Sequence, residues 1–255
     1  MANFYNTDKY IIEVELDEYA GEEFNPRQWD NMGTFIAFHR NFKSPDKYEH
    51  SYFEDELESR DIEYTGNQNI DVKEYLTKMS KDHLIYSVYI HDHTSVSFSL
   101  SNANYPFNDV WDSCLFGFIF TSKEKIREEY SISRITKEIE AKVYEQFKSE
   151  VKTYEYYANG EIFSYVLYDK ETLEELDACC GYYGYDLKEN GILSSIGIDD
   201  ESELEEMGEH KNFEVFAENN YELAPQLSVQ ERVRIRVDAE EMELSIWQKK
   251  NYYPI

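Results

Sequence analysis

The sequence predicts an α+β fold, in which a mixed or antiparallel sheet packs with a long amphipathic helix, and a small acidic C-terminal appendage of helix and strands follows. Two patterns support this prediction. Short aromatic or β-branched segments recur along the chain, and one long segment has apolar residues at every fourth position. The composition agrees, because 41% of the 255 residues are hydrophobic and 16% are aromatic, whereas only 10 are Gly and 5 are Pro. Such a chain has enough apolar surface for a packed core.

Six short segments have the composition of β-strands. They are rich in Ile, Val, Tyr and Phe, and they partly alternate between apolar and polar positions, as strands with one face on a core do. The segments are 10–16, 34–40, 84–90, 95–100, 115–121 and 162–168. Together they predict one sheet.

A helix of about 24 residues is predicted over 134–157, because its apolar residues recur every fourth position. A shorter helix is predicted over 70–81, and residues 122–130 are predicted to begin a third. We expect the large side chains of the strands and the long helix to share one core, in which burying each is favourable by roughly 1.5–3 kcal/mol. This core would hold Phe35, Phe38, Trp111, Phe118, Phe120, Ile139, Val143 and Phe147.

Two domains are expected, with a boundary near residue 188. Residues 1–188 hold all the predicted strands and the long helix, and residues 189–255 form the acidic appendage. The appendage includes the run DDESELEEMGE, which would carry acids at helical spacing if 200–208 is a helix. It continues with the strand-like FEVF, RVRIRV and MELSIW, and the three Arg of RVRIRV are expected to pair with acids of the chain itself. No linker rich in Pro, Gly or Ser separates the two parts.

The sequence shows neither a secretion signal nor a membrane span, and we therefore expect a soluble, cytoplasmic protein. The three Cys, of which Cys179 and Cys180 are adjacent, do not form a disulfide framework and suit a reducing compartment. The N-terminus lacks the basic and apolar regions of a signal peptide. No stretch approaches the roughly 18–20 apolar residues of a membrane span.

Several longer motifs occur in order: DEYAGEEFNPRQWDNMGTFIAFHRNF, YIHDHTSVSFSLSNANYPFNDVWDSCLFGFIFTSKEKIREEY and ELDACCGYYG. Over residues 10–187 they resemble a widespread family of uncharacterised proteins from phages and other mobile elements. Its pattern is Pro-Arg-x-Trp-Asp-Asn, Tyr-x-Tyr-Asp-His-Ser-Gly, Trp-Asp-Ser-Gly-Gln-Val-Gly and Ser-Cys-Trp-Gly-Phe-Tyr-Gly. The sequence departs from it at Thr94, Ser95, Cys114, Leu115 and Cys180. The resemblance implies a mobile-element origin, hence the cytoplasm of a host cell, and it implies no activity.

Asp112, Cys114, His91 and His93 have the ingredients of a Cys-His nucleophile or of a metal site. On a strand, however, HDH sends the two His to one face and Asp92 to the other, and no Cys-x-x-Cys or His-x-x-x-His completes a ligand set. A structural turn followed by a core strand is the favoured interpretation. We therefore expect no catalytic residue, no metal and no cofactor, with a hydrolase-like enzyme as the less favoured alternative.

Charge is the strongest functional signal, because 53 Asp and Glu against 25 Lys and Arg give a net charge of -28. Acids at helical i, i+3 or i+4 positions lie about 5–6 Å apart. Acids at alternate strand positions lie about 6.6–6.8 Å apart. Both spacings resemble that of phosphates along a nucleic-acid strand. Because DNA-binding proteins use Lys and Arg to meet phosphates, a folded acidic surface can compete for the same groove.

The leading hypothesis is a DNA-mimic inhibitor of a host defence nuclease, of the anti-restriction or anti-CRISPR kind. Its partner would be a basic nucleic-acid-binding protein, and the chain itself would bind neither nucleic acid nor membrane. The alternatives are a phage accessory or scaffold protein without enzymatic activity, and acid runs that are merely solvated faces. The target and the oligomeric state stay open. The expected contact residues are Glu54, Asp55, Glu56 and Glu58, and Asp199, Asp200, Glu201, Glu203, Glu205 and Glu206.

Overall fold

The computed structural model divides the chain into two compact units. Unit 1 consists of residues 1–20 and 160–255, and unit 2 of residues 21–159. Both contain antiparallel sheet and helix, so the predicted α+β class is confirmed. Within the described residues, no helix combines the length and apolar character needed to cross a membrane. The structure describes residues 2–18, 20–101, 105–107, 111–172, 174–198, 202 and 204–209, with side chains omitted for 2 and 205–209.

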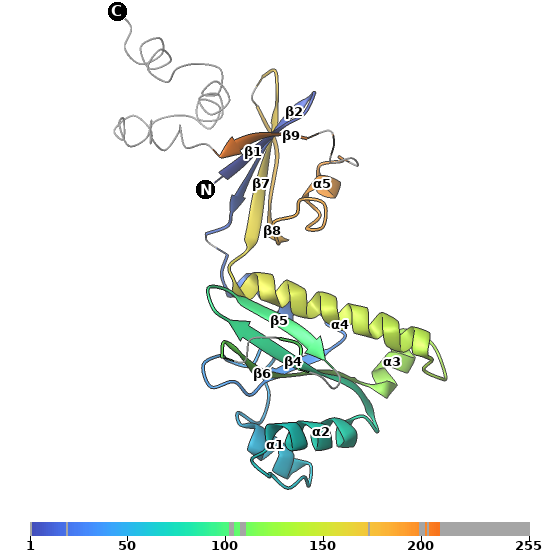
Figure 1. The fold of residues 1–255 in the computed structure, drawn as a ribbon. Helices are drawn as coiled ribbons and strands as arrows, with labels where there is room; N and C mark the ends of the chain where they lie inside the picture. The colour runs from blue at the N-terminus through green and yellow to red at the C-terminus, as the bar shows by residue number, and fades with distance from the viewer. Residues whose placement is uncertain are drawn as a thin grey trace, which may run out of the picture. The chain divides into compact units, whose positions relative to one another are not determined.

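Unit 2 is built on a four-stranded antiparallel sheet of order β3-β6-β4-β5. Each of the four strands was predicted from its alternating apolar pattern. Their bounds are β3 Thr34–Ala37, β4 His83–Asp92, β5 Val96–Ser101 and β6 Ser113–Ser122. Figure 1 shows the long helix α4 on one side of this sheet and the short helices α1 and α2 on the other.

Three of the four α-helices described in unit 2, α2, α3 and α4, begin after a residue whose side chain accepts one of their first backbone N–H groups. Thr136 accepts a hydrogen bond from the backbone N–H of Ile139 at the start of α4, and Ser122 does the same for Lys125 at the start of α3. The helix predicted over 134–157 therefore begins after Thr136. The bounds are α1 Phe53–Ser59, α2 Gln68–Met79, α3 Lys123–Glu129 and α4 Lys137–Ala158.

The expected single core is two cores, one on each face of the sheet. Consecutive strand residues point to opposite faces, and both faces of this sheet are covered by helices. Val143 and Phe147 of α4 therefore pack with Phe35, whereas α1 and α2 cover Phe118 and Phe120. Phe38 packs with the second group and Ile139 is half-buried beside the first. Trp111 is outside both, 92% exposed, because it precedes β6 rather than lying within it.

Side chains close both outer strands of this sheet. The backbone N–H groups of β5 donate to Glu155 and Asn159 at the end of α4, at 2.6 and 2.9 Å. Those of β3 donate to Asp46 and Ser44, at 2.7 and 3.1 Å. Blocking edge N–H groups in this way prevents further strands from pairing there.

Unit 1 contains a five-stranded antiparallel sheet of order β8-β7-β2-β1-β9. One face of it packs against the short helix α5, Ile192–Ser195, in a core that includes Ile12, Val14, Phe163 and Ile192. Strands β2 and β7 were predicted, and β1 and β8 were not. The bounds are β1 Ala2–Asn6, β2 Tyr10–Leu16, β7 Ile162–Asp169, β8 Glu175–Tyr183 and β9 Glu205–Glu209.

This sheet explains why the chain does not divide near residue 188. Strand β1 pairs with β9, which follows the expected boundary, whereas β2 and β7 of the same sheet precede it, so segments from both sides of residue 188 share one sheet. Residues 205–209 form a strand, so the helix considered over 200–208 is wrong for 205–208, and residues 200, 201 and 203 lie outside the described residues. Local patterns cannot show that the first strands pair with segments far along the chain.

Candidate functional site

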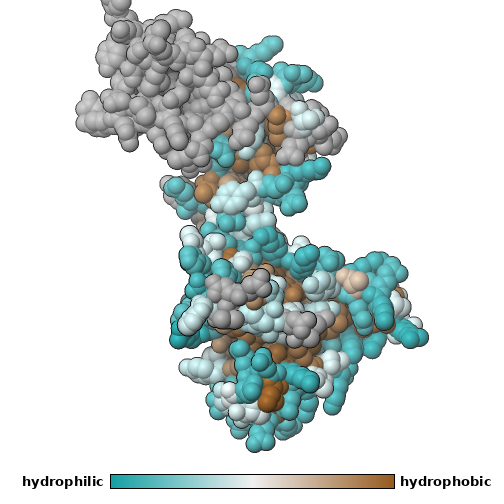
Figure 2. Space-filling view, viewed as in Figure 1, coloured by the Kyte–Doolittle hydropathy of each residue, from teal (hydrophilic) through white to brown (hydrophobic). Residues whose placement is uncertain are grey.

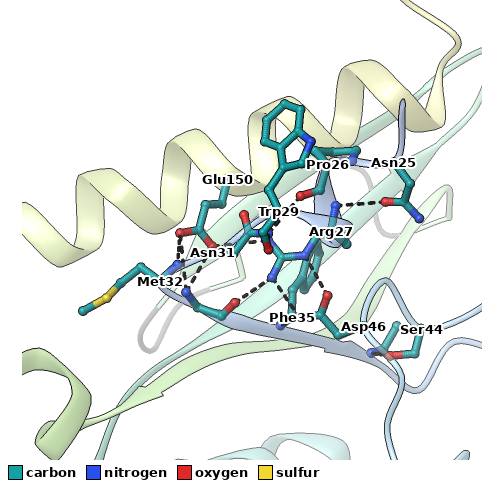
Figure 3. Close-up of polar contacts among 12 residues, drawn as sticks. Asn25, Pro26, Arg27, Trp29, Asn31, Met32, Phe35, Ser44, Asp46 and Glu150 are labelled. Carbon is teal, nitrogen blue, oxygen red and sulfur yellow. Dashed lines mark hydrogen bonds and ion pairs between the residues drawn. The ribbon is translucent and has the colours of Figure 1, made fainter. Parts of the chain in front are cut away.

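The Pro-Arg-x-Trp-Asp-Asn motif builds structure rather than a site (Figure 3). A short 3-10 helix, Pro26–Gln28, follows Asn25, whose side chain accepts the backbone N–H of Arg27. The Arg27 side chain is 3% exposed and donates to both carboxylate oxygens of Asp46, at 2.9 and 2.8 Å. It also donates to Glu150 of α4 at 3.2 Å. The motif thus joins the start of unit 2 to its long helix.

Ion pairs and hydrogen bonds to backbone N–H groups hold the 3-10 helix and the residues after it against α4. Burial of the guanidinium opposes its charge, but hydrogen bonds and ion pairs with Asp46 and Glu150 outweigh burial and raise the pKa of Arg27. Glu150 also accepts the backbone N–H groups of Met32 and Gly33, at 2.8 and 3.1 Å. Glu150 is not among the residues expected from the sequence, although an acid beside the apolar stripe of a helix is a signal of a buried partner.

The motifs that carry His39, Arg40, Asp92, Asp112 and Cys114 meet at one end of the unit 2 sheet. These five residues help to line a cavity of about 560 Å³ where β4 ends and β6 begins. The backbone N–H of Asp92 donates to the carbonyl of Asp112 at 2.7 Å, which holds the two strand ends together. The structure therefore does bring together two of the four residues weighed as catalytic, Asp112 and Cys114.

The two histidines of HDH do not complete a catalytic set there. His93 is exposed, with its Nε2 3.9 Å from Asp112 Oδ2, and the ring of His91 contacts that of Phe107. Across the described part of the chain, no histidine hydrogen-bonds to Cys114, and no group of three or more His, Cys, Asp and Glu is placed to hold a metal. Burial raises the pKa of the Cys114 thiol, which disfavours the reactive thiolate.

Thiol reactivity gives a direct check of this environment. Cys179 and Cys180 are exposed on β8, whereas Cys114 is half-buried. Because a raised pKa lowers the thiolate fraction at neutral pH, we expect iodoacetamide to alkylate Cys114 about tenfold or more slowly than the other two. Peptide mass spectrometry of a labelling time course measures the rates. Labelling of Cys114 in the folded protein at the rate of the unfolded chain would contradict this account.

Three of the four expected contact residues on α1 face solvent. Glu54, Asp55 and Glu58 are exposed, and Asp61 and Glu63 continue the exposed acids after the helix. The acids of the first turn also favour the helix itself, because they lie near its positive N-terminal end. We define the α1 cluster as Glu54, Asp55 and Glu58, all of which are exposed; Glu54 and Asp55 also lie in the first turn, where negative charge favours the helix.

Glu56 is the exception. It was expected to contact a partner protein, but it is fully buried and cannot reach one, so that expectation is wrong. Its Oε1 accepts hydrogen bonds from the hydroxyls of Tyr75 and Tyr48, at 2.8 and 3.1 Å, and from Arg60 Nε at 3.1 Å. Burial, then the Glu56 charge, raises the pKa of Tyr75, so this hydroxyl remains a donor. Glu56 holds α1 against α2, and a run of acids in the sequence conceals this role.

The second expected cluster is placed only in part. Asp199, Asp200, Glu201 and Glu203 lie outside the described residues. Glu205 and Glu206 belong to β9, where they pair in register with Asn6 and Tyr5 of β1. Their side chains are not described, so their role as contact residues stays a prediction.

A third acidic group lies on the β7–β8 hairpin. Asp169 organises the turn, since it accepts the backbone N–H groups of Thr172 and Glu171, and the first of these bonds is the main cause of its lowered pKa. Asp177 accepts the hydroxyl of Tyr165 at 2.6 Å. The remaining three acids are exposed and define the hairpin cluster: Glu171, Glu174 and Glu175.

The hairpin cluster adjoins an open strand edge. β8 is the outer strand of its sheet, and residues 175–180 are exposed on both faces. Leu176 is 51% exposed. Within the described residues 175–180, no side chain accepts a backbone N–H group of β8 as Asp46 and Glu155 do at the edges of the other sheet, and the Cys179 thiol donates to the carbonyl oxygen of Cys180 at 3.7 Å. Such an edge can accept a strand from another protein.

Comparison with known proteins found no matching family model, no matching curated protein and no matching solved structure.

Proposed function

We propose that this protein is an inhibitor that binds the cationic DNA-binding surface of another protein and excludes DNA from it, with a host defence nuclease as the expected target. Two separate acidic surfaces would take part: the hairpin cluster and the acidic run at 199–206 in unit 1, and the α1 cluster in unit 2. The proposal concerns protein recognition and requires no catalytic group in this chain.

The uneven distribution of charge carries the proposal. Residues 1–20 and 160–209 contain 20 Asp and Glu against three Lys and Arg, whereas residues 21–159 contain 25 against 16. Charge that serves only solubility does not need to be concentrated in this way, because repulsion within one small unit destabilises its compact state. A local excess of carboxylates produces a strong negative field, which attracts a Lys- and Arg-lined groove.

The open edge of β8 would supply directional contacts, which exposed charges alone do not provide. Exposed ion pairs contribute little to affinity singly, and their main effect is on the rate of encounter. Backbone pairing with β8 and contact with Leu176 would add directional hydrogen bonds and apolar burial beside the hairpin cluster. A cationic strand at the rim of the partner's groove fits this combination best.

The test neutralises each cluster in the full chain. One variant carries Glu171→Gln, Glu174→Gln and Glu175→Gln, a second carries the matching changes in the α1 cluster, and a third converts the six acids at 199–206. A partner is first captured from host lysate at low salt, and it qualifies only if it binds duplex DNA that the chain displaces. We expect each variant to bind about tenfold more weakly than wild type at low salt, from several small contributions. The difference should shrink as salt screens the charges.

A matched control separates local charge from total charge. Glu138, Glu140 and Glu145 of α4 are also exposed, but Glu138 and Glu145 pair with Lys142 and Lys148. Converting these three to Gln changes the net charge by the same three units as the hairpin and α1 variants, and we expect it to leave partner affinity unchanged. If all the variants bind like wild type and affinity does not vary with salt, charge mimicry is not the mechanism.

A further inference from the structure

A second cavity, of about 750 Å³, lies in unit 2 between α2 and β4. This volume is in the range of pockets that hold small molecules, roughly 300–1,000 Å³. Figure 2 shows apolar surface between the sheet and the α2 layer on this side of the unit. The residues that line the cavity include Val72, Lys73, Leu76, Ser87, Tyr89 and Tyr105.

The sequence of two neighbouring strands explains why the space is hollow. Ser87 lies between Ile85 and Tyr89 on the β4 face that meets α2, and its small side chain leaves room below the helix. Across from β4, the same face of β5 presents only serines, since Ser101 pairs with Ser87 and Ser99 with Tyr89. No bulky side chain from these two strands fills the gap there.

Ser87 gives the cavity a polar floor. It is 2% exposed, and its Oγ has no hydrogen-bond partner in the part of the chain that the structure describes. Nearly all buried hydroxyls in proteins are paired, so an unpaired one that lines a cavity marks a place where a ligand atom would bond. The hydroxyl can both donate and accept.

The walls and the rim define the rest of the ligand. Val72 and Leu76 of α2 are apolar, and the rings of Tyr89 and Tyr105 meet edge to face, with centroids 5.0 Å apart. Burial raises the pKa of Tyr89, so its phenol stays neutral. Lys73 is exposed at the rim and is the cation that lines this cavity.

We propose that this cavity binds a small aromatic anion: a ring body between Leu76 and the tyrosines, a hydroxyl or carbonyl oxygen bonded to Ser87, and an acidic group facing Lys73. The site lies in unit 2 and does not depend on the proposed inhibitory function.

Two matched probes test the proposal on the full chain: 6-hydroxynaphthalene-2-sulfonate and naphthalene-2-sulfonate, which differ only by the hydroxyl. Calorimetric titration should show saturable binding at one site per chain, with the hydroxylated probe about three- to tenfold tighter, as one hydrogen bond provides. Ser87→Ala should abolish this preference and leave the parent probe's affinity unchanged. Ser59→Ala, which removes a hydroxyl outside the cavity, should leave the preference intact.

Charge reversal at the rim tests the anionic group. Lys73→Glu should weaken both probes about equally, by about three- to tenfold, whereas Lys78→Glu, on the same helix but outside the cavity, should not. Both lysines are exposed, so neither change should affect folding. The proposal is overturned if neither probe binds saturably, if the hydroxyl preference survives Ser87→Ala, or if Lys73→Glu binds as wild type does.

Discussion

Replacing Arg27 with Met is expected to destabilise unit 2 by about 3–5 kcal/mol, because it leaves buried carboxylates without their cation. The Arg27 and Glu150 side chains are 3% and 5% exposed, so water cannot substitute for the lost partner. The Asp46 side chain is 19% exposed, so water can partly solvate its carboxylate, and we expect the loss of its cation to cost less there. Chemical denaturation followed by hydrogen exchange of peptides from β3 and α4 measures the loss and locates it in this unit.

The bidentate geometry makes the Arg27 position selective for arginine. Arg27→Lys keeps the charge but cannot form two parallel bonds to Asp46 and also reach Glu150, so we expect an intermediate loss. Glu150→Gln, alone and combined with Arg27→Met, completes a double-mutant cycle. The two changes should be non-additive by about 0.5–3 kcal/mol, because the double variant no longer buries an unpaired carboxylate at Glu150. Strict additivity would show that the ion pair does not couple the 3-10 helix to α4.

The strands that could be predicted are those whose pattern is local. Strands β2, β3, β4, β5, β6 and β7 all appear within or over segments that the partly alternating apolar pattern predicts. β8 was missed because its residues are exposed on both faces, so no alternation marks it. The pairing of β1 and β2 with segments after residue 160 depends on contacts far apart in sequence, and no local pattern encodes it.

The candidate sites were less predictable than the fold, for a related reason. A run of acids gives no sign that Glu56 points inward, since its burial depends on Tyr75, which is 19 residues away. Ser87 is one of many serines in the chain, and only the placement of α2 above it creates a cavity. Exposure and burial of polar groups are decided by tertiary packing, so composition indicates the kind of surface but not which residues form it.

A bulge in β6 also lay outside what alternation can predict. Gly117 pairs with Val88 and Leu115 pairs with Tyr89, so Phe116 is the extra residue on β6. As a result Leu115 and Phe118, three apart, pack in the same core, and Phe116 packs in the other. Glycine is common at such points because a neighbouring backbone approaches closely.

Because the β3 backbone lies so close, we expect Gly117→Ala, which adds only one carbon atom, to lower the stability of unit 2 strongly. A Cβ at this position would lie 1.9 Å from the Ile36 carbonyl oxygen and 2.7 Å from the Ala37 Cα. Both are backbone atoms of β3, which cannot rotate away as a side chain can. The strand would have to leave its register with β6 and its bonds to Asp46 and Ser44.

We expect Gly117→Ala to cost about 4 kcal/mol or more, the range reached only when backbone or core packing is disrupted. Gly21→Ala is the matched control: its Cβ would meet only the flexible end of the Glu23 side chain, and its backbone is extended, so the change should stay within about 0.5 kcal/mol. Denaturant midpoints give the two values, and loss of amide protection in β3 and β6 would place the damage. If Gly117→Ala unfolds at the wild-type midpoint, β3 does not pack on β6 in this register.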